Sequence, residues 1–265
     1  MRAGTRPTVT GASREVHPGQ SLQIGASGGA GVGHALSVDG IESTLLNANI
    51  ATAAAETVAF KGPVLLPSGG AVSISLAPSS TLSFGGTING SASLKIDVPS
   101  GAVSLAGKVG AVTPLAALSF PRVGAVTGSA TIAVNGGGKS VNGISFGRDV
   151  GGIALTAAGS TVTGCTGAGI RIAAGGPNSG WSRKLSGFTV TKCGTGIDFT
   201  YAVDQSASQA GFHGWTVSGN TVSANSAHGV RLGADGGGRS SSSALVVSSN
   251  QVSKNVNDGI RVEGT

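Results

Sequence analysis

Few residues of this 265-residue chain combine the type and the spacing that catalysis needs. The acids of the C-terminal half, Asp198, Asp204, Asp235 and Asp258, stand apart from one another in the sequence. Glycoside hydrolysis generally uses a pair of carboxylates, and a uronate lyase needs a base and a way to neutralise the substrate carboxylate, such as Ca²⁺ held by several acids. We therefore predict no catalytic residues and no cofactor, and we favour a non-enzymatic role.

Cys165 and Cys193 could form a disulfide or remain as two buried thiols. They follow the matching tripeptides Thr161–Thr163 and Thr189–Thr191 after one intervening residue. If those segments stack as neighbouring strands about 4.8 Å apart, the Cα separation falls inside the disulfide range. A bridge between adjacent coils adds little constraint, so reduced thiols are the favoured alternative. No His or third Cys stands at ligand spacing, and we predict no metal site.

A repeat in the C-terminal half indicates the elements that must position these residues. Each copy carries Val, a hydroxyl residue, Cys or Asn, and then Gly followed by an aliphatic, a charged and an apolar residue. The four copies are residues 161–172, 189–199, 221–232 and 251–262. Their glycines, Gly169, Gly196, Gly229 and Gly259, are separated by 27, 33 and 30 residues. Such a period is typical of solenoids, in which each repeat forms one coil.

Stacked coils place equivalent residues on top of one another. We expect an aliphatic column of Val162, Val190, Val222 and Val252. An inward amide ladder of Asn225 and Asn255 should satisfy the polar groups of the turn. The repeated glycine before the next strand is expected to supply backbone freedom for the bend.

The charged position of the repeat should point outward, because side chains alternate along a strand. Arg171, Asp198, Arg231 and Arg261 then form a ladder in which the first three alternate in sign and the last two repel mildly. Arg231 lies on a basic strip that could hold an acidic polysaccharide. A solvated, partly compensated charge ladder is the favoured alternative.

Two insertions between coils combine aromatic and charged residues, and such loops can bind sugar rings. They span residues 173–186 and 201–215. The candidate ligand-binding residues on them are Trp181, Arg183, Lys184, Tyr201, Asp204, His213 and Trp215. The equally weighted alternative is that both tryptophans cap the solenoid wall.

The motifs Ser218–Ser223 (SGNTVS) and Asp258–Ile260 (DGI) resemble the repeats of pectate-lyase-like proteins. This resemblance covers residues 151–265 and implies a right-handed parallel β-helix, and on occasion a polysaccharide-active enzyme. Residues 100–120, with their Val-Ser-Leu and Gly-Lys-Val-Gly runs, resemble filamentous-haemagglutinin-like exoproteins. That second resemblance implies a long surface solenoid.

Together these patterns predict an all-β, right-handed, single-stranded parallel β-helix of roughly 8 to 11 coils. We expect a flexible or capping segment at 1–35, irregular solenoid coils at 36–150 and regular repeats at 151–265. The composition agrees: 47 glycines, 11% charged and 4% aromatic residues do not favour helices, whereas recurring Val, Ile and Leu can build a continuous core.

The predicted function is a structural or adhesive segment of a secreted or cell-surface bacterial exoprotein. A lyase, hydrolase or tailspike-like depolymerase is the enzymatic alternative, and a filament subunit that self-associates through the solenoid ends is the third. The net charge of +6 permits attraction to an acidic glycan or another cell-surface polymer. Dispersed charge and few aromatics argue against nucleic acid, and no apolar run approaches the roughly 18 residues of a membrane helix.

Overall fold

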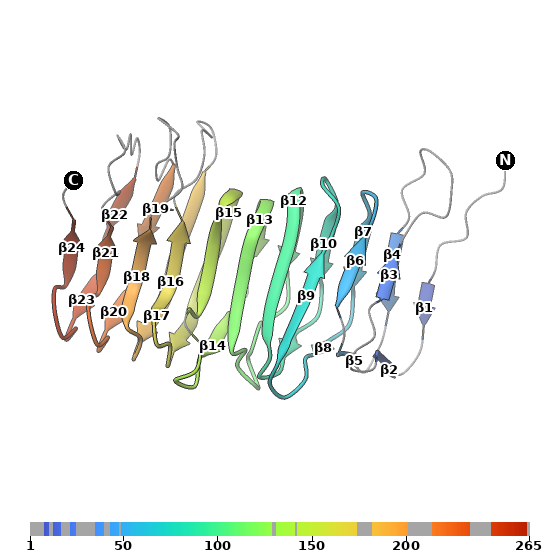
Figure 1. The fold of residues 1–265 in the computed structure, drawn as a ribbon, viewed down its shortest axis with the longest axis horizontal. Coiled ribbons are helices and arrows are strands. Elements are labelled where there is room, and N and C mark those ends of the chain that lie inside the picture. Colours follow the sequence, from blue (N-terminus) through green and yellow to red (C-terminus); the bar gives the residue numbers. More distant parts are fainter. Residues whose placement is uncertain are drawn as a thin grey trace.

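The computed structural model describes residues 8–10, 13–16, 22–24, 35–39, 43–47, 49–128, 131–140, 142–173, 182–200, 214–233 and 245–263. Within these ranges every regular element is a β-strand, and the strands pair in parallel to form a β-solenoid. Figure 1 shows them side by side in chain order, with β1 and β24 at opposite ends. The all-β parallel solenoid predicted from the repeat is confirmed.

The strands are short except where one continues around a bend. They are β1 (Thr8–Thr10), β2 (Ser13–Val16), β3 (Leu22–Ile24), β4 (Ala35–Asp39), β5 (Ser43–Leu46), β6 (Ile50–Thr52), β7 (Thr57–Phe60), β8 (Val64–Leu65), β9 (Ala71–Ser75), β10 (Thr81–Phe84), β11 (Ile88–Asn89), β12 (Ser93–Leu105), β13 (Ala117–Gly128), β14 (Ala133–Asn135), β15 (Ile144–Thr163), β16 (Ala168–Ala173), β17 (Arg183–Thr191), β18 (Thr195–Thr200), β19 (Trp215–Ser218), β20 (Thr221–Ser223), β21 (Val230–Leu232), β22 (Val246–Ser248), β23 (Gln251–Ser253) and β24 (Ile260–Val262).

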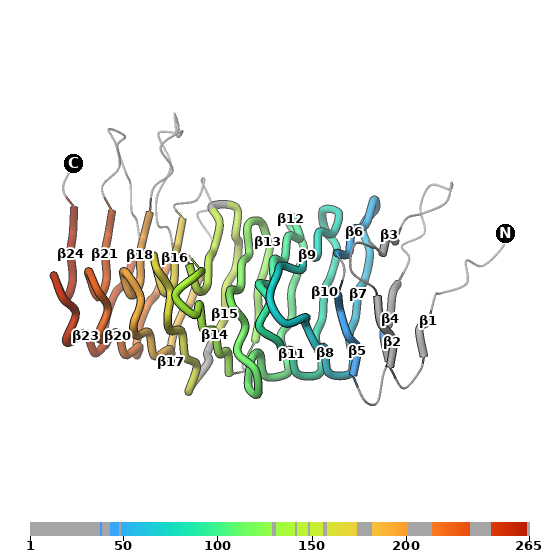
Figure 2. Tube along the Cα trace, turned by 60° about the horizontal axis from the view of Figure 1, so that its bottom comes forward, coloured from blue at the N-terminus to red at the C-terminus, as the bar shows by residue number. Residues whose placement is uncertain are grey.

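Paired positions form unbroken columns along the solenoid. Each strand bonds to a strand of the next coil, so its backbone groups are satisfied by chain neighbours one repeat away. One column of partners runs through Thr8, Ser37, Ala59, Ser83, Ser104, Thr127, Ala154, Lys184, Thr216 and Val246. A second, four-stranded sheet contains β2, β5, β8 and β11. The view in Figure 2 shows the same succession of coils.

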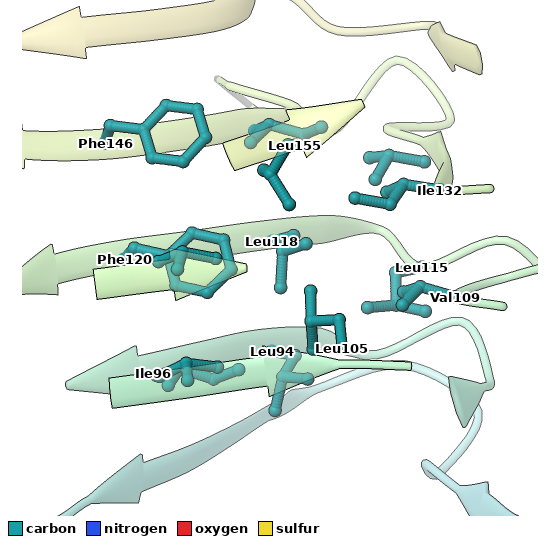
Figure 3. Close-up of a cluster of buried hydrophobic side chains, with 14 of the residues drawn as sticks. Leu94, Ile96, Leu105, Val109, Leu115, Leu118, Phe120, Ile132, Phe146 and Leu155 are labelled. Carbon is teal, nitrogen blue, oxygen red and sulfur yellow. The ribbon is translucent and has the colours of Figure 1, made fainter. Parts of the chain in front are cut away.

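The core lies inside the coils, and many strands contribute to it by alternating buried with less buried residues. In β10, Leu82 and Phe84 are buried while Thr81 is exposed. Phenylalanines of adjacent coils stack in parallel: Phe60 and Phe84 have ring centroids 5.2 Å apart with an interplanar angle of 6°. Figure 3 shows how leucine, isoleucine and phenylalanine side chains from successive coils form layers. Burial of this apolar surface is the main favourable term in folding.

The solenoid continues through both segment boundaries expected from the sequence. Within residues 1–35, strands β1, β2 and β3 pair in parallel with β4, β5 and β6. Strand β15 runs from Ile144 to Thr163 and so crosses residue 150 without interruption. The two halves differ in their side chains and also in their sheets, since the four-stranded sheet of β2, β5, β8 and β11 lies within the N-terminal half.

Candidate functional site

The predicted valine column is confirmed. Val162 pairs with Val190, Val190 with Val222, and Val222 with Val252. The first three side chains are fully buried, and Val252 packs against the core with part of its surface exposed. This column fixes the register of the turns that follow it, because a slip of one residue would turn each valine outward.

The predicted amide ladder is also present, at the turn that follows the valine column. The backbone N–H of Cys193 donates to Asn225 Oδ1 at 3.0 Å, and the N–H of Asn225 donates to Asn255 Oδ1 at 3.1 Å. Asn225 Nδ2 also donates to Asn255 Oδ1 at 2.9 Å and to the Val190 carbonyl at 3.4 Å. The fully buried amide therefore has partners on both neighbouring coils.

A second amide ladder, which the sequence reasoning missed, precedes the valine column. The N–H of Phe188 donates to Asn220 Oδ1 at 3.0 Å, and both the N–H and Nδ2 of Asn220 donate to Asn250 Oδ1, at 3.0 and 2.9 Å. The signal was available, since Asn220 and Asn250 each stand directly before the repeated hydroxyl- or amide-Val-Ser tripeptide.

The repeated glycines are needed for space, so the expectation that they supply bending freedom is wrong. Gly169, Gly196 and Gly229 are not among the residues with positive φ. A Cβ on Gly196 would lie 2.2 Å from Val222 Cγ1 and 2.5 Å from the Gly229 carbonyl oxygen. The two other glycines meet the next valine equally closely. The column therefore packs each valine against the backbone of the preceding coil.

Cys165 and Cys193 are buried free thiols. Their sulfur atoms donate to the carbonyls of Thr163 and Thr191, at 3.6 and 3.4 Å. The hydrogen bond with Cys193, followed by burial, raises the pKa of the Cys165 thiol, and the same hydrogen bond lowers the pKa of Cys193. The two thiols therefore titrate as a coupled pair that holds its second proton strongly.

The outward charge ladder is present, and carboxylates neutralise more of its arginine charge than the sequence suggests. Arg231 makes a bidentate contact with Asp198, at 2.8 Å from Nε to Oδ1 and 3.0 Å from Nη2 to Oδ2. These hydrogen bonds raise the pKa of the Arg231 guanidinium, which stays charged. Arg171 is in register with Asp198, but its Nε donates to Thr200 Oγ1 at 3.1 Å.

The repulsion expected between Arg231 and Arg261 is offset by a carboxylate between them. Glu263 Oε1 lies 3.7 Å from Arg231 Nη1 and 3.2 Å from Arg261 Nε. Arg261 Nη1 also lies 3.4 Å from Asp258 Oδ2. This balance favours the solvated-ladder interpretation over a basic strip centred on Arg231.

Two candidate ligand-binding residues lie in the core instead of on protruding loops. Trp215 is 3% exposed and packs against Phe146 and Phe199, with ring centroids 5.8 and 6.5 Å away. Arg183 is 2% exposed, and its Nε donates to the carbonyls of Val150 and Gly151 at 3.0 and 2.9 Å. Burial lowers the pKa of Arg183. Placing either side chain on a solvent-facing loop was wrong, because each begins a strand at an inward position.

The remaining loop candidates divide into one surface residue and four that are not described. Lys184 is exposed on β17, facing outward beside the inward Arg183. Trp181, Tyr201, Asp204 and His213 lie outside the described residues. The expectation that these four bind a ligand stays a prediction.

A groove follows the turns that carry the cysteines and the first amide ladder. We call it the turn groove; its volume is about 630 Å³, and its lining residues are Cys165, Thr166, Lys192, Cys193, Ala224, Asn225, Ser226, Lys254 and Val256. Lys192, Ala224 and Lys254 have φ of 55°, 54° and 55°, and Gly164 has a φ of 69° at the matching position. The left-handed turn thus brings two lysines to one edge of the solenoid.

The part of the chain that the structure describes contains no group of three or more His, Cys, Asp or Glu side chains able to hold a metal ion. His228 Nδ1 lies 3.2 Å from Asp258 Oδ2, an oxygen that Arg261 Nη1 also contacts. The same residues contain no helix that could cross a membrane. Comparisons with protein-family models, with curated proteins and with solved structures gave no match to this chain.

Proposed function

We propose that this chain is a rigid structural or adhesive segment of a secreted or cell-surface bacterial exoprotein. The observation that carries the proposal is the continuous register of paired positions from Thr8 to Val246. Each coil is bonded to the next by backbone hydrogen bonds and, in the C-terminal half, by two amide ladders. Bending such a stack would break several of these bonds at once, so the solenoid is suited to hold its two ends at a fixed separation.

The arrangement of carboxylates supports this role over the enzymatic alternative. Asp198 is held in a bidentate contact by Arg231, and Glu263 lies between Arg231 and Arg261. A glycosidase needs one carboxyl group that can donate a proton and a second that can act as base or nucleophile. Here both oxygens of Asp198 already accept hydrogen bonds from Arg231, and Glu263 Oε1 accepts one from Arg261, so these carboxylates are engaged in the charge ladder.

Distance measurements by pulsed electron paramagnetic resonance test the rigid spacer. The two spin labels are attached at Ser83→Cys and Val246→Cys in a Cys165→Ser/Cys193→Ser background. Both positions belong to the column of paired residues that begins at Thr8, and they are six coils apart. At about 4.8 Å per step the labels should give one narrow distribution near 30 Å. A broad distribution would contradict a rigid role, and cleavage of acidic polysaccharides by the purified protein would favour the enzyme.

Self-association is a second candidate, favoured by the last described coil. Val256, Ile260 and Val262 are 74%, 55% and 69% exposed. One coil earlier, Val230, the partner of Ile260, is fully buried, and Leu232, the partner of Val262, is partly buried. A second copy stacked head to tail would continue the parallel register and cover these side chains. Sedimentation velocity should then show larger species at higher concentration that Ile260→Lys removes. A monomer at all concentrations would exclude this assembly.

A further inference from the structure

The turn groove runs along the solenoid axis past the carboxyl ends of β15, β17, β20 and β23, which lie side by side in Figure 2. Four successive coils contribute to it, so it spans about 14 Å along the axis at roughly 4.8 Å per coil. A groove of this direction suits an extended polymer better than a compact small molecule.

The groove carries positive charge that the described residues do not neutralise. Among the residues that line it are two lysines and no acid. Within the described part of the chain, neither Lys192 nor Lys254 forms an ion pair, whereas Arg122, Arg231 and Arg261 all contact carboxylates. The two lysines stand on alternate coils with Ala224 between them, so their backbone positions are about 10 Å apart.

A third lysine extends the charge to the preceding turn. Lys139 is exposed on the turn 136–139, and the N–H of Gly138 in that turn donates to the Gly164 carbonyl at 2.7 Å. The basic edge therefore continues past the end of the groove at Cys165. An anionic chain lying in the groove would therefore meet a lysine on alternate coils.

The groove lining also offers hydrogen-bond acceptors held in fixed positions. Thr166 Oγ1 donates to the Ser140 carbonyl and Ser226 Oγ donates to the Cys193 carbonyl, both at 3.3 Å. With their protons used in this way, both hydroxyl oxygens present lone pairs to an approaching donor. The surrounding backbone is bonded between coils, so little ordering entropy is lost when a ligand binds.

We propose that the turn groove binds an extended acidic polysaccharide, with carboxylates on Lys192 and Lys254 and sugar hydroxyls on Thr166 and Ser226. Single-stranded nucleic acid fits less well, because such sites usually add aromatic platforms for the bases and none of the lining residues is aromatic. The inference names a partner for the proposed adhesive role. The spin-label distance tests the rod independently of any ligand.

Binding of fluorescent polygalacturonate oligomers tests the proposal, with neutral dextran and an oligothymidylate as comparison probes. The groove variant is Lys192→Asn/Lys254→Asn, since Asn tolerates the left-handed conformation. The control is Lys95→Asn/Lys108→Asn, which removes the same charge from exposed positions outside the groove. The groove variant should bind polygalacturonate roughly twofold to thirtyfold more weakly than the control, the range expected for two exposed ion pairs.

Three results would overturn the proposal: no binding of polygalacturonate, equal losses in the two variants, or tighter binding of oligothymidylate. The last would identify a nucleic acid as the occupant. If the groove variant melts far below the control, Lys192→Gly/Lys254→Gly replaces it in the binding experiment. This variant removes the same two charges, and glycine readily adopts the positive φ of both positions. The same weakening must then appear with that variant.

Discussion

The two halves of the solenoid meet one requirement with different side chains. At the turns, a backbone N–H needs an acceptor from the following coil. In the N-terminal half, the backbone N–H of Glu56 donates to Ser80 Oγ at 3.1 Å. There the Ser80 hydroxyl donates back to Ala77 within its own turn, at 2.6 Å. In the C-terminal half, Asn225 instead accepts from one coil and donates to the next. An amide can therefore propagate a ladder along the solenoid, whereas a hydroxyl satisfies a single turn.

The largest effect should come from adding one methyl group inside the amide-ladder half. Gly196→Ala would force a Cβ against Val222 Cγ1 and the Gly229 carbonyl, and we expect it to lower the free energy of unfolding by about 3 kcal/mol. Gly259→Ala is the matched control, because the nearest atom is 3.7 Å away, and we expect a change below about 0.5 kcal/mol. Equal losses in urea denaturation would show that the glycine–valine contact does not hold the coils in register.

Removing one rung of the ladder should cost somewhat less. Asn225→Ala leaves the buried N–H of Cys193 without its acceptor and takes a donor away from Asn255. We expect a loss of about 2 to 3 kcal/mol, since the buried N–H of Cys193 stays unsatisfied and Asn255 Oδ1 keeps only the backbone N–H of residue 225 as a donor. Urea denaturation followed by circular dichroism measures it. A loss below about 1 kcal/mol would mean that water replaces the amide and that the ladder is not a cooperative unit.

The corresponding hydroxyl should contribute less still. Ser80 is almost fully buried, and its Oγ accepts the N–H of Glu56 at 3.1 Å. Ser80→Ala leaves that single N–H unpaired, and we expect a loss of about 1 to 2 kcal/mol in the same denaturation experiment. A greater loss than that of Asn225→Ala would reverse the comparison between the two halves.

Extending the ladder into the cysteine pair should have the smallest effect. Cys193 occupies the ladder position one coil before Asn225, and Cys193→Asn would place an acceptor beside the turn of Cys165. Because the residues are similar in size, we expect a change of less than about 1 kcal/mol in either direction. A loss of about 3 kcal/mol would show that the buried thiols, and not the ladder, set the packing of this turn.

The solenoid could be predicted from sequence because its repeat records the stacking directly. Val222 and Val252 recur at the same offset from Asn225 and Asn255, so a single alignment gives the register, the inward column and one amide ladder. The N-terminal coils lack an amide repeated at one position of the turn, and there the alternation of apolar positions, as in β10, is the main signal.

The surface was harder to predict because exposure depends on where each loop ends. Trp215 and Arg183 stand next to the insertions, and only the pairing of Arg183 with both Ile153 and Trp215 shows that they face inward. The turn groove was missed since Lys192 and Lys254 come together through coil stacking, although 62 residues separate them in the chain.

Disulfide trapping tests most directly whether equivalent positions of successive coils stack. In the Cys165→Ser/Cys193→Ser background, Thr221→Cys/Gln251→Cys joins two outward residues that are paired in register. Thr221→Cys/Ser253→Cys is displaced by two residues, which places the Cα atoms about 8 Å apart and beyond the usual disulfide range. We predict rapid oxidation of the first pair and little of the second. Equal rates, or faster bridging of the displaced pair, would contradict the stacked register from which the fold, the ladders and the groove are all derived.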